Sequence, residues 1–387
     1  MPATLPAELL NLIIPASVDE RPTRANLLAN QRQLCSLARV NRTWNAWATP
    51  QIHQHMHLSQ KQLRKLARNA SSSASTAKLS KGHEARSTSS CRSANSADVV
   101  ESTSVPLEQR AHQVKTLALG KWIDEYGSGL KTMLKKFDSA TQVYVEGTKS
   151  WSALTSVSSL PSIETLHLTR VYNSLPPPDG FPQVQRLSVT FGLNDGIDWS
   201  FLSTHKLPKL STLVLDPYDW TFSQAEGFQT AFAAASPQLQ ALALGGSDNG
   251  QVDWIGLLRK ADNLKHLYIH TAASTNLVMA VPNLPSHLET LRIASVCATP
   301  EQVATMLGAQ QLEGQPASTP TPLENLRLLT LPCASTNGWD LGTEKSRKAI
   351  EAIETWCHKK NIKLEYVPRG KAALEDWTPE ESKPLVA

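Results

Sequence analysis

Three histidines at alternate positions have a spacing that could bind a metal ion in this chain of 387 residues. Successive side chains of a β-strand point to opposite faces, so His53, His55 and His57 would share one face if this stretch were a strand. Neutral imidazole is a common metal ligand, but no cysteine or carboxylate lies beside these histidines. We therefore predict a strand without a metal ion, with a metal site as the alternative.

Other candidate chemistry is sparse. The stretch Gly245–Gly250 reads GGSDNG and has the glycine content of a phosphate-binding loop, but the Lys-Ser/Thr pair of such loops does not follow it. The sequence has no G-x-S-x-G nucleophile motif and no paired Cys and His cluster. These observations predict no catalytic residue, no metal and no cofactor, and therefore a protein that is not an enzyme.

The cysteine content favours a reducing compartment. The five cysteines are odd in number and widely spaced, and none forms a Cys-x-x-Cys pair, which argues against a disulfide framework or a zinc site. No apolar run reaches the roughly 20 residues of a membrane span, and the N-terminus lacks the features of a signal peptide. We expect a cytoplasmic or nuclear protein that does not enter a membrane.

One basic segment stands out from the small net charge of +4. Between Lys61 and Arg92 eight basic residues face one acid, Glu84. Residues 70–104 are rich in serine and lack aromatic side chains, so we predict a disordered insertion. A nucleic-acid-associated protein acting through this basic segment would bind in a salt-sensitive way. The segment has no aromatics for base stacking, which argues against a nucleic-acid partner.

A phrase of the form Leu-x-x-Leu-x-Leu recurs along the rest of the chain. The middle apolar residues of successive phrases are 26, 23, 21, 26, 29, 25, 24 and 38 residues apart. All but the last of these lie within the about 20–29 residues that are typical of leucine-rich repeats. The nine phrases begin at Val114, Thr141, Ile163, Val184, Leu210, Leu239, Leu264, Leu288 and Leu326.

Stacked short strands would let these leucines build one continuous core. We expect helices on the outer side, for example at 226–235, 255–261, 300–307 and 344–360. The asparagine that follows the strand in regular leucine-rich repeats is missing, so the turns must satisfy their backbone groups otherwise, and an irregular arc is expected. Four tryptophans, Trp199, Trp220, Trp254 and Trp339, are expected to anchor the connecting segments, with exposed binding positions as the alternative. Outward strand positions are where we would look for substrate contacts: Lys115, His167, Ser188, His266, Tyr268, Glu289 and Arg292.

Two amphipathic stretches precede the repeats. The first, LPAELLNLII, starts with proline and glutamate in its first turn, as expected of a helix start. The second carries apolar residues three or four apart from Leu34 to Trp47, which predicts a second helix. A polar interval from Pro15 to Gln33 separates them and leaves room for a loop or an extra helical turn.

The order of these stretches resembles the F-box, the module that docks substrate receptors onto the Skp subunit of a cullin-based ubiquitin ligase, in the divergent form common in fungi. By that resemblance Leu34 and Leu37 would support the Skp contact, while Val40 and Trp44 would hold the helices together. The partner-binding residues implied are Leu5, Pro6, Leu9, Ile13, Leu34, Leu37, Val40 and Trp44.

Together these features predict an α/β protein in which a small helical F-box precedes an irregular leucine-rich-repeat solenoid. The expected parts are an F-box-like domain at 1–52, a repeat domain at 53–367 containing the insertion at 70–104, and a flexible tail at 368–387. The resemblance implies a substrate-recognition subunit that bridges the Skp adaptor, and through it a cullin, to an unknown protein substrate. The alternative is a repeat scaffold without a ligase role.

Overall fold

The structure is a computed structural model that divides into two compact units. One unit comprises Met1–Val143 with Ser156–Ser162, and the other comprises Tyr144–Thr155 with Ile163–Ala387. The residues described are 24–40, 42–66, 110–120, 123, 127–148, 151–171, 179–191, 198–217, 222–245, 252–270, 284, 286–294, 298–309, 323–332, 339, 342–367, 374, 377 and 379. The predicted first helix and the predicted insertion at 70–104 lie outside them, and the domain boundary after residue 52 stays a prediction.

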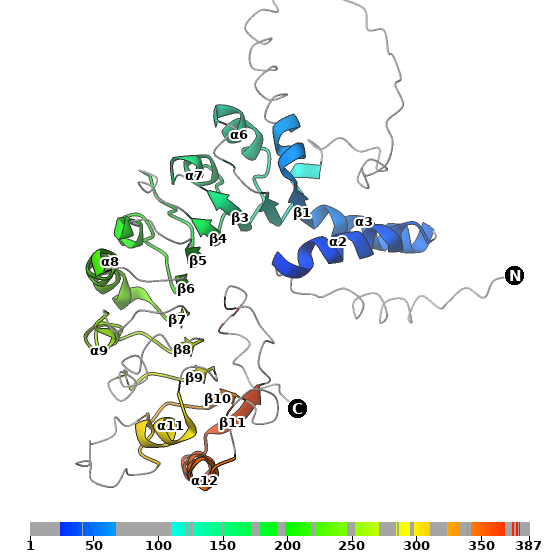
Figure 1. Ribbon diagram of the computed structural model, residues 1–387. Helices are drawn as coiled ribbons and strands as arrows, with labels where there is room; N and C mark the ends of the chain where they lie inside the picture. Colours follow the sequence, from blue (N-terminus) through cyan, green and yellow to red (C-terminus); the bar gives the residue numbers. More distant parts are fainter. Residues whose placement is uncertain are drawn as a thin grey trace, which may run out of the picture. The chain divides into compact units, whose positions relative to one another are not determined.

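In the described part of the chain, eleven strands form one parallel sheet whose order follows the chain (Figure 1). The strands are β1 (His55–Leu58), β2 (Thr116–Leu119), β3 (Gln142–Thr148), β4 (Thr165–Val171), β5 (Arg186–Phe191), β6 (Thr212–Pro217), β7 (Ala241–Leu244), β8 (His266–Ile269), β9 (Thr290–Ile293), β10 (Leu328–Pro332) and β11 (Lys363–Val367). Each of the nine phrases contributes one strand, β2 to β10. The ordered stack of short parallel strands predicted from their spacing is therefore confirmed.

Leucines stacked in register make the core. On β6 and β7, Leu213 lies beside Leu242 and Leu215 beside Leu244, and these side chains are buried. A single repeat cannot bury its own leucines, so each relies on the repeats before and after it.

Helices and short 3-10 turns connect the strands. Their bounds are α2 (Arg24–Ala38), α3 (Arg42–Gln54), α6 (Gly127–Leu134), α7 (Trp151–Val157), η2 (Trp199–Leu202), α8 (Phe222–Ala235), η3 (Ser236–Gln238), α9 (Trp254–Leu258), α11 (Pro300–Met306) and α12 (Glu344–Lys359). In the second unit, α8, α9, α11 and α12 lie on one side of the strands, as predicted (Figure 1). None of the described helices is long and apolar enough to cross a lipid bilayer.

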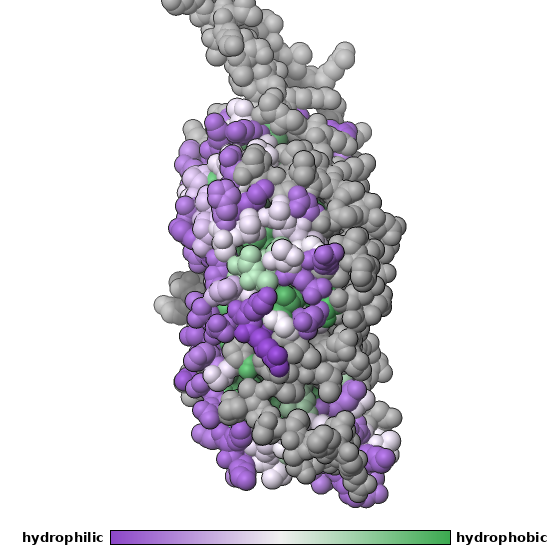
Figure 2. Space-filling model, turned by 90° about the vertical axis from the view of Figure 1, so that its left-hand side faces the viewer, coloured by the Kyte–Doolittle hydropathy of each residue, from purple (hydrophilic) through white to green (hydrophobic). Residues whose placement is uncertain are grey.

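An aromatic cluster fastens the outer helices of the second unit. The ring of Phe228 lies 4.9 Å from Trp199 and 5.6 Å from Trp254, between centroids. Both tryptophans and Trp339 are buried, which confirms their anchoring role, whereas Trp220 lies outside the described residues. On the side carrying α8 and α9, hydrophilic residues dominate and the hydrophobic areas are small and separate (Figure 2).

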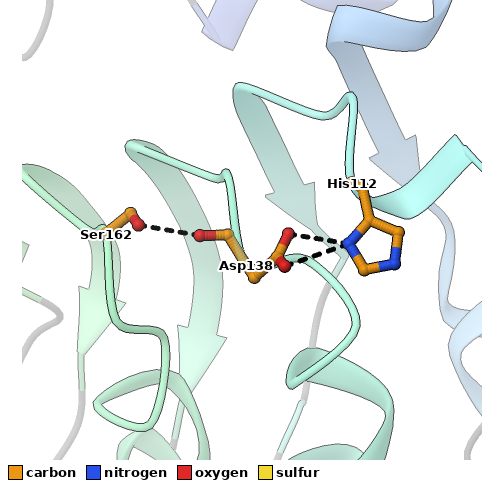
Figure 3. A network of polar contacts seen from close by, with 3 residues as sticks. All are labelled: His112, Asp138 and Ser162. Carbon is orange, nitrogen blue, oxygen red and sulfur yellow. Dashed lines mark hydrogen bonds and ion pairs between the residues drawn. The ribbon is translucent and has the colours of Figure 1, made fainter.

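Polar side chains that precede the strands in the sequence form hydrogen bonds in place of the missing asparagines. In the first unit, Ser162 Oγ donates to the Asp138 carbonyl at 2.7 Å, and the Asp138 carboxylate lies 2.9 Å from His112 Nδ1 (Figure 3). The hydrogen bond from His112 is the main reason that the pKa of Asp138 lies below its ordinary value.

Hydrogen bonds equivalent to that between Ser162 and the Asp138 carbonyl occur in the second unit. Asn263 Nδ2 donates to the Pro237 carbonyl at 2.6 Å, and Asn325 Nδ2 donates to the Ser286 carbonyl at 2.8 Å. Each donor lies three residues before its strand, and each acceptor lies four residues before the preceding strand. The turns therefore satisfy their carbonyls at the start of the strands rather than after them.

The single helix predicted from Leu34 to Trp47 is wrong, because a turn divides this stretch between two helices. Helix α2 ends at Ala38 and α3 begins at Arg42. The Asn45 side chain donates to the Ala38 carbonyl at 3.0 Å, which satisfies a backbone group left open at the end of α2. Since α2 starts at Arg24, the part of the predicted polar interval from Arg24 to Gln33 is helical, whereas its earlier part lies outside the described residues.

A glycine substitution can test how tightly successive turns of the second unit pack. Gly180 has a positive φ of 61°, and a β-carbon there would lie 2.6 Å from Lys206 Cα. We expect Gly180→Ala to lower the free energy of unfolding by about 1–3 kcal/mol, measured by urea denaturation, because both the backbone conformation and the contact become strained.

Gly227→Ala is the matched control. Gly227 lies within α8, and an added β-carbon would meet Trp199 Cδ1 at an ordinary 3.5 Å. Alanine is the better helix former, so this variant should be neutral or gain up to about 1 kcal/mol. Equal destabilisation by both substitutions would contradict the packing described.

Candidate protein-binding surface

The face of the sheet opposite the leucine core, here called the strand face, carries an apolar patch in the second unit. Val214 on β6 lies beside Ala243 on β7, which lies beside Tyr268 on β8. With Ala241 these side chains form the strand-face patch (Val214, Ala241, Ala243 and Tyr268). All four are buried, so something covers them.

Two residues from the C-terminal segment cover the strand-face patch. Leu374 and Trp377 pack on it and are 2% and 1% exposed. The indole ring of Trp377 lies 5.8 Å from the Tyr268 ring, between centroids, and Arg186 Nη2 donates to the Trp377 carbonyl. The flexible tail predicted for 368–387 is therefore wrong at these two positions, because apolar side chains of the segment find an apolar surface in the fold.

Gly245 makes the seat for Leu374. It directly follows β7, and its amide donates to the Leu215 carbonyl at 2.7 Å. A β-carbon at this position would lie 2.6 Å from Leu374 Cδ2. The start of the GGSDNG stretch therefore serves close packing against Leu374.

Cationic and aromatic groups border the patch. The guanidinium carbon of Arg292 lies 4.5 Å from the centre of the Tyr268 ring, a cation–π geometry. His270 meets the same tyrosine edge-on at 5.6 Å. Burial, and secondarily the charge of Arg292, lower the pKa of His270.

Not all the outward positions named from the sequence are accessible. His167, Ser188 and Tyr268 are buried, and His167 stacks on Tyr144 with 4.2 Å between ring centroids. The others, Lys115, His266, Glu289 and Arg292, are at least partly exposed. Side chains on a strand face cover one another across neighbouring strands, which the repeat pattern alone does not reveal.

A polar pocket lies in front of strands β8 to β10. Its volume is about 310 Å³, and it is lined by Asp262, Asn263, Lys265, His287, Glu289, Asn325 and Arg327. Lys265 Nζ lies 3.4 Å from Glu289 Oε1, and Asn263 and Asn325 already donate to turn carbonyls. The lining carries both signs of charge.

The residues implied by the F-box resemblance are only partly described. Leu5, Pro6, Leu9 and Ile13 lie outside the described residues. Among the others, Leu34 is buried, Leu37 and Trp44 are half-buried, and Val40 is 60% exposed. Val40 therefore does not hold the helices together, because it lies in the turn between α2 and α3 with its side chain in solvent.

The three histidines do not share a strand. His53 belongs to α3, and its Nδ1 lies 3.2 Å from Gln113 Oε1, while His55 and His57 lie on β1. The one-sided arrangement considered as a metal site is therefore wrong. Throughout the described ranges, no group of three or more His, Cys, Asp or Glu residues could hold a metal ion.

Comparison with known proteins gives little beyond this geometry. No model of a protein family matches the chain, and no curated protein matches it. Among solved structures, a chain from the crystal structure of the TLR13–ssRNA13 complex is similar, with 12% sequence identity and a TM-score of 0.30 over 58% of this chain. The match spans 26% of that chain's length.

Acidification should weaken the fold through His270. A histidine whose pKa is lowered by folding contributes stability that is complete above the ordinary value of 6.5 and is lost as the pH falls through the folded pKa. We expect His270→Gln to reduce the loss of unfolding free energy between pH 7.5 and pH 5.5, measured by urea denaturation.

Arg292→Met should have the same effect to a smaller extent, since the arginine charge is the second cause of the shift. His53 and His55 also have lowered pKa values because of burial, so an acid-dependent loss should persist in both variants. A pH profile of His270→Gln that coincides with that of the wild type would contradict this account.

Proposed function

We propose that this protein is a non-enzymatic scaffold that holds a protein segment on the strand face of its repeats. One observation carries the proposal: Leu374 and Trp377, from the chain's own C-terminal segment, already lie on that face. A surface that buries a leucine and a tryptophan is suited to binding polypeptide. The pocket in front of β8 to β10, in contrast, offers only polar groups of mixed charge.

The rigidity of the strand face supports this function. Tyr268 and Ala243 are held by the pairing of β7 with β8, and the core leucines beneath them are packed from repeat to repeat. A partner that binds such a surface does not need to order it first, and this saves conformational entropy on binding.

Photo-crosslinking tests the scaffold function. A photoreactive phenylalanine analogue at His266, on β8, should capture a protein partner in cells, whereas the same analogue at Glu351, exposed on α12, should not. Crosslinks that form only from Glu351 would place the binding surface on the helix side and overturn the proposal.

In finer detail, we propose that the scaffold is the substrate receptor of a Skp-cullin-F-box ubiquitin ligase. The support is the resemblance of the N-terminal region to an F-box, together with the α2–α3 pair, which leaves Val40 exposed. The helices would hold the Skp adaptor, the repeats would present a protein substrate at a high effective concentration, and other subunits would supply the catalysis.

Co-purification with the Skp subunit of the source organism tests the ligase role. We expect stoichiometric binding by the wild-type chain, loss in the Leu9→Asp and Ile13→Asp double variant, and at least tenfold weaker binding by Val40→Asp, because a carboxylate would enter an apolar contact.

Lys131→Asp on α6 serves as the matched control, since it places the same carboxylate on an exposed helix of the repeats. Circular dichroism should show that all variants remain folded. If a folded wild-type chain does not bind the Skp subunit, the protein is a repeat scaffold without a ligase role.

A further inference from the structure

The strand-face patch and Gly245, together called the recess below, meet the C-terminal segment at two positions. Small residues, Ala241, Ala243 and Gly245, line β7 and its end, and the larger Tyr268 rises beside them on β8. Leu374 fills the seat above Gly245, and Trp377 fills the seat against Tyr268. The recess is thus complementary to an aliphatic side chain followed three positions later by tryptophan.

We propose that this recess is the docking site for a partner protein segment of the form aliphatic, acidic, acidic, tryptophan, and that Leu374 and Trp377 occupy it until the partner displaces them. This inference rests on the scaffold function proposed above and names the class of partner.

Charge complementarity supports an acidic segment. The two residues between Leu374 and Trp377 in the sequence are Glu375 and Asp376. Arg186 on β5 donates to the Trp377 carbonyl, and Arg292 on β9 lies over Tyr268. The contacts of the described residues thus place two guanidinium groups and one carboxylate, that of Asp216 beside Gly245, at the recess.

One polar group of the bound segment lacks a hydrogen-bond partner in the described part of the chain. Trp377 Nε1 is buried, and no hydrogen-bond acceptor for it is found among the described residues. A buried donor without a partner weakens binding. The internal segment competes for the recess at an effective concentration on the order of 1 mM. A similarly apolar segment from another protein can displace it when its own concentration and affinity overcome this competition.

Peptide titration of the full-length chain tests the proposal. The probe is a synthetic peptide of residues 370–383, and binding is measured by isothermal titration calorimetry. We expect the Leu374→Ala and Trp377→Ala double variant, whose internal segment no longer competes, to bind the peptide about 100-fold more tightly than the wild type, if the peptide Kd is on the order of 10 μM.

Two controls isolate the recess. A peptide with alanine at both the leucine and the tryptophan should not bind, and Gly245→Val added to the double variant should abolish binding, because its side chain fills the leucine seat. If the double variant is unfolded by circular dichroism, Trp377→Leu replaces it, and its peptide affinity should lie above that of the wild type.

Three outcomes would overturn the proposal. A folded double variant that does not bind the peptide would make Leu374 and Trp377 purely structural. Binding that survives Gly245→Val would place the peptide elsewhere. A wild-type dimer that becomes monomeric in the double variant, measured by light scattering, would make the recess an interface between copies. The crosslinking from His266 reads out the scaffold function separately, so either idea can fail while the other stands.

Discussion

Strand register is the constraint on which the second unit depends. The carbonyl of the residue before a strand accepts two amides from the next repeat: Gln240 accepts from Lys265 at 2.8 Å and His266 at 3.0 Å, and Lys265 in turn accepts from Glu289 and Thr290. A slip of one residue would turn every leucine to the strand face and every strand-face residue to the core. The repeated pair of bonds prevents such a slip at each step from β4 to β10.

Fixed register determines the chemistry of the surface. Because Val214, Ala243 and Tyr268 occupy matching positions on adjacent strands, they form one apolar surface on which Leu374 and Trp377 pack. The same register aligns the residues in front of the strands, so that Asn263 and Asn325 can reach the turn before them. A single geometric rule thus creates both an apolar docking face and the polar bonds that hold the turns.

The two units contribute differently to the proposed functions. In the first unit, α2 and α3 meet at a sharp turn that leaves Val40 in solvent while Leu34 stays buried. In the second unit, the apolar surface of the strand face is already covered by Leu374 and Trp377. A receptor built in this way would present one exposed contact for an adaptor and keep its substrate site occupied until a competing segment arrives.

Local periodicity was enough to predict the strands β2 to β10, and the segments between them predicted the outer helices α8, α9, α11 and α12. Each leucine phrase carries its own strand signal, and the spacing between phrases specifies how the strands stack. The break between Ala38 and Arg42 could not be read in this way, because the apolar spacing continues through it and the bond from Asn45 decides where α2 ends. Nor could the docking of Trp377 on Val214 be predicted, since the two residues lie far apart in the sequence and meet only when the register has placed Val214, Ala243 and Tyr268 side by side. Apolar pattern encodes which side chains need burial, whereas the partner that buries them is decided by the tertiary fold.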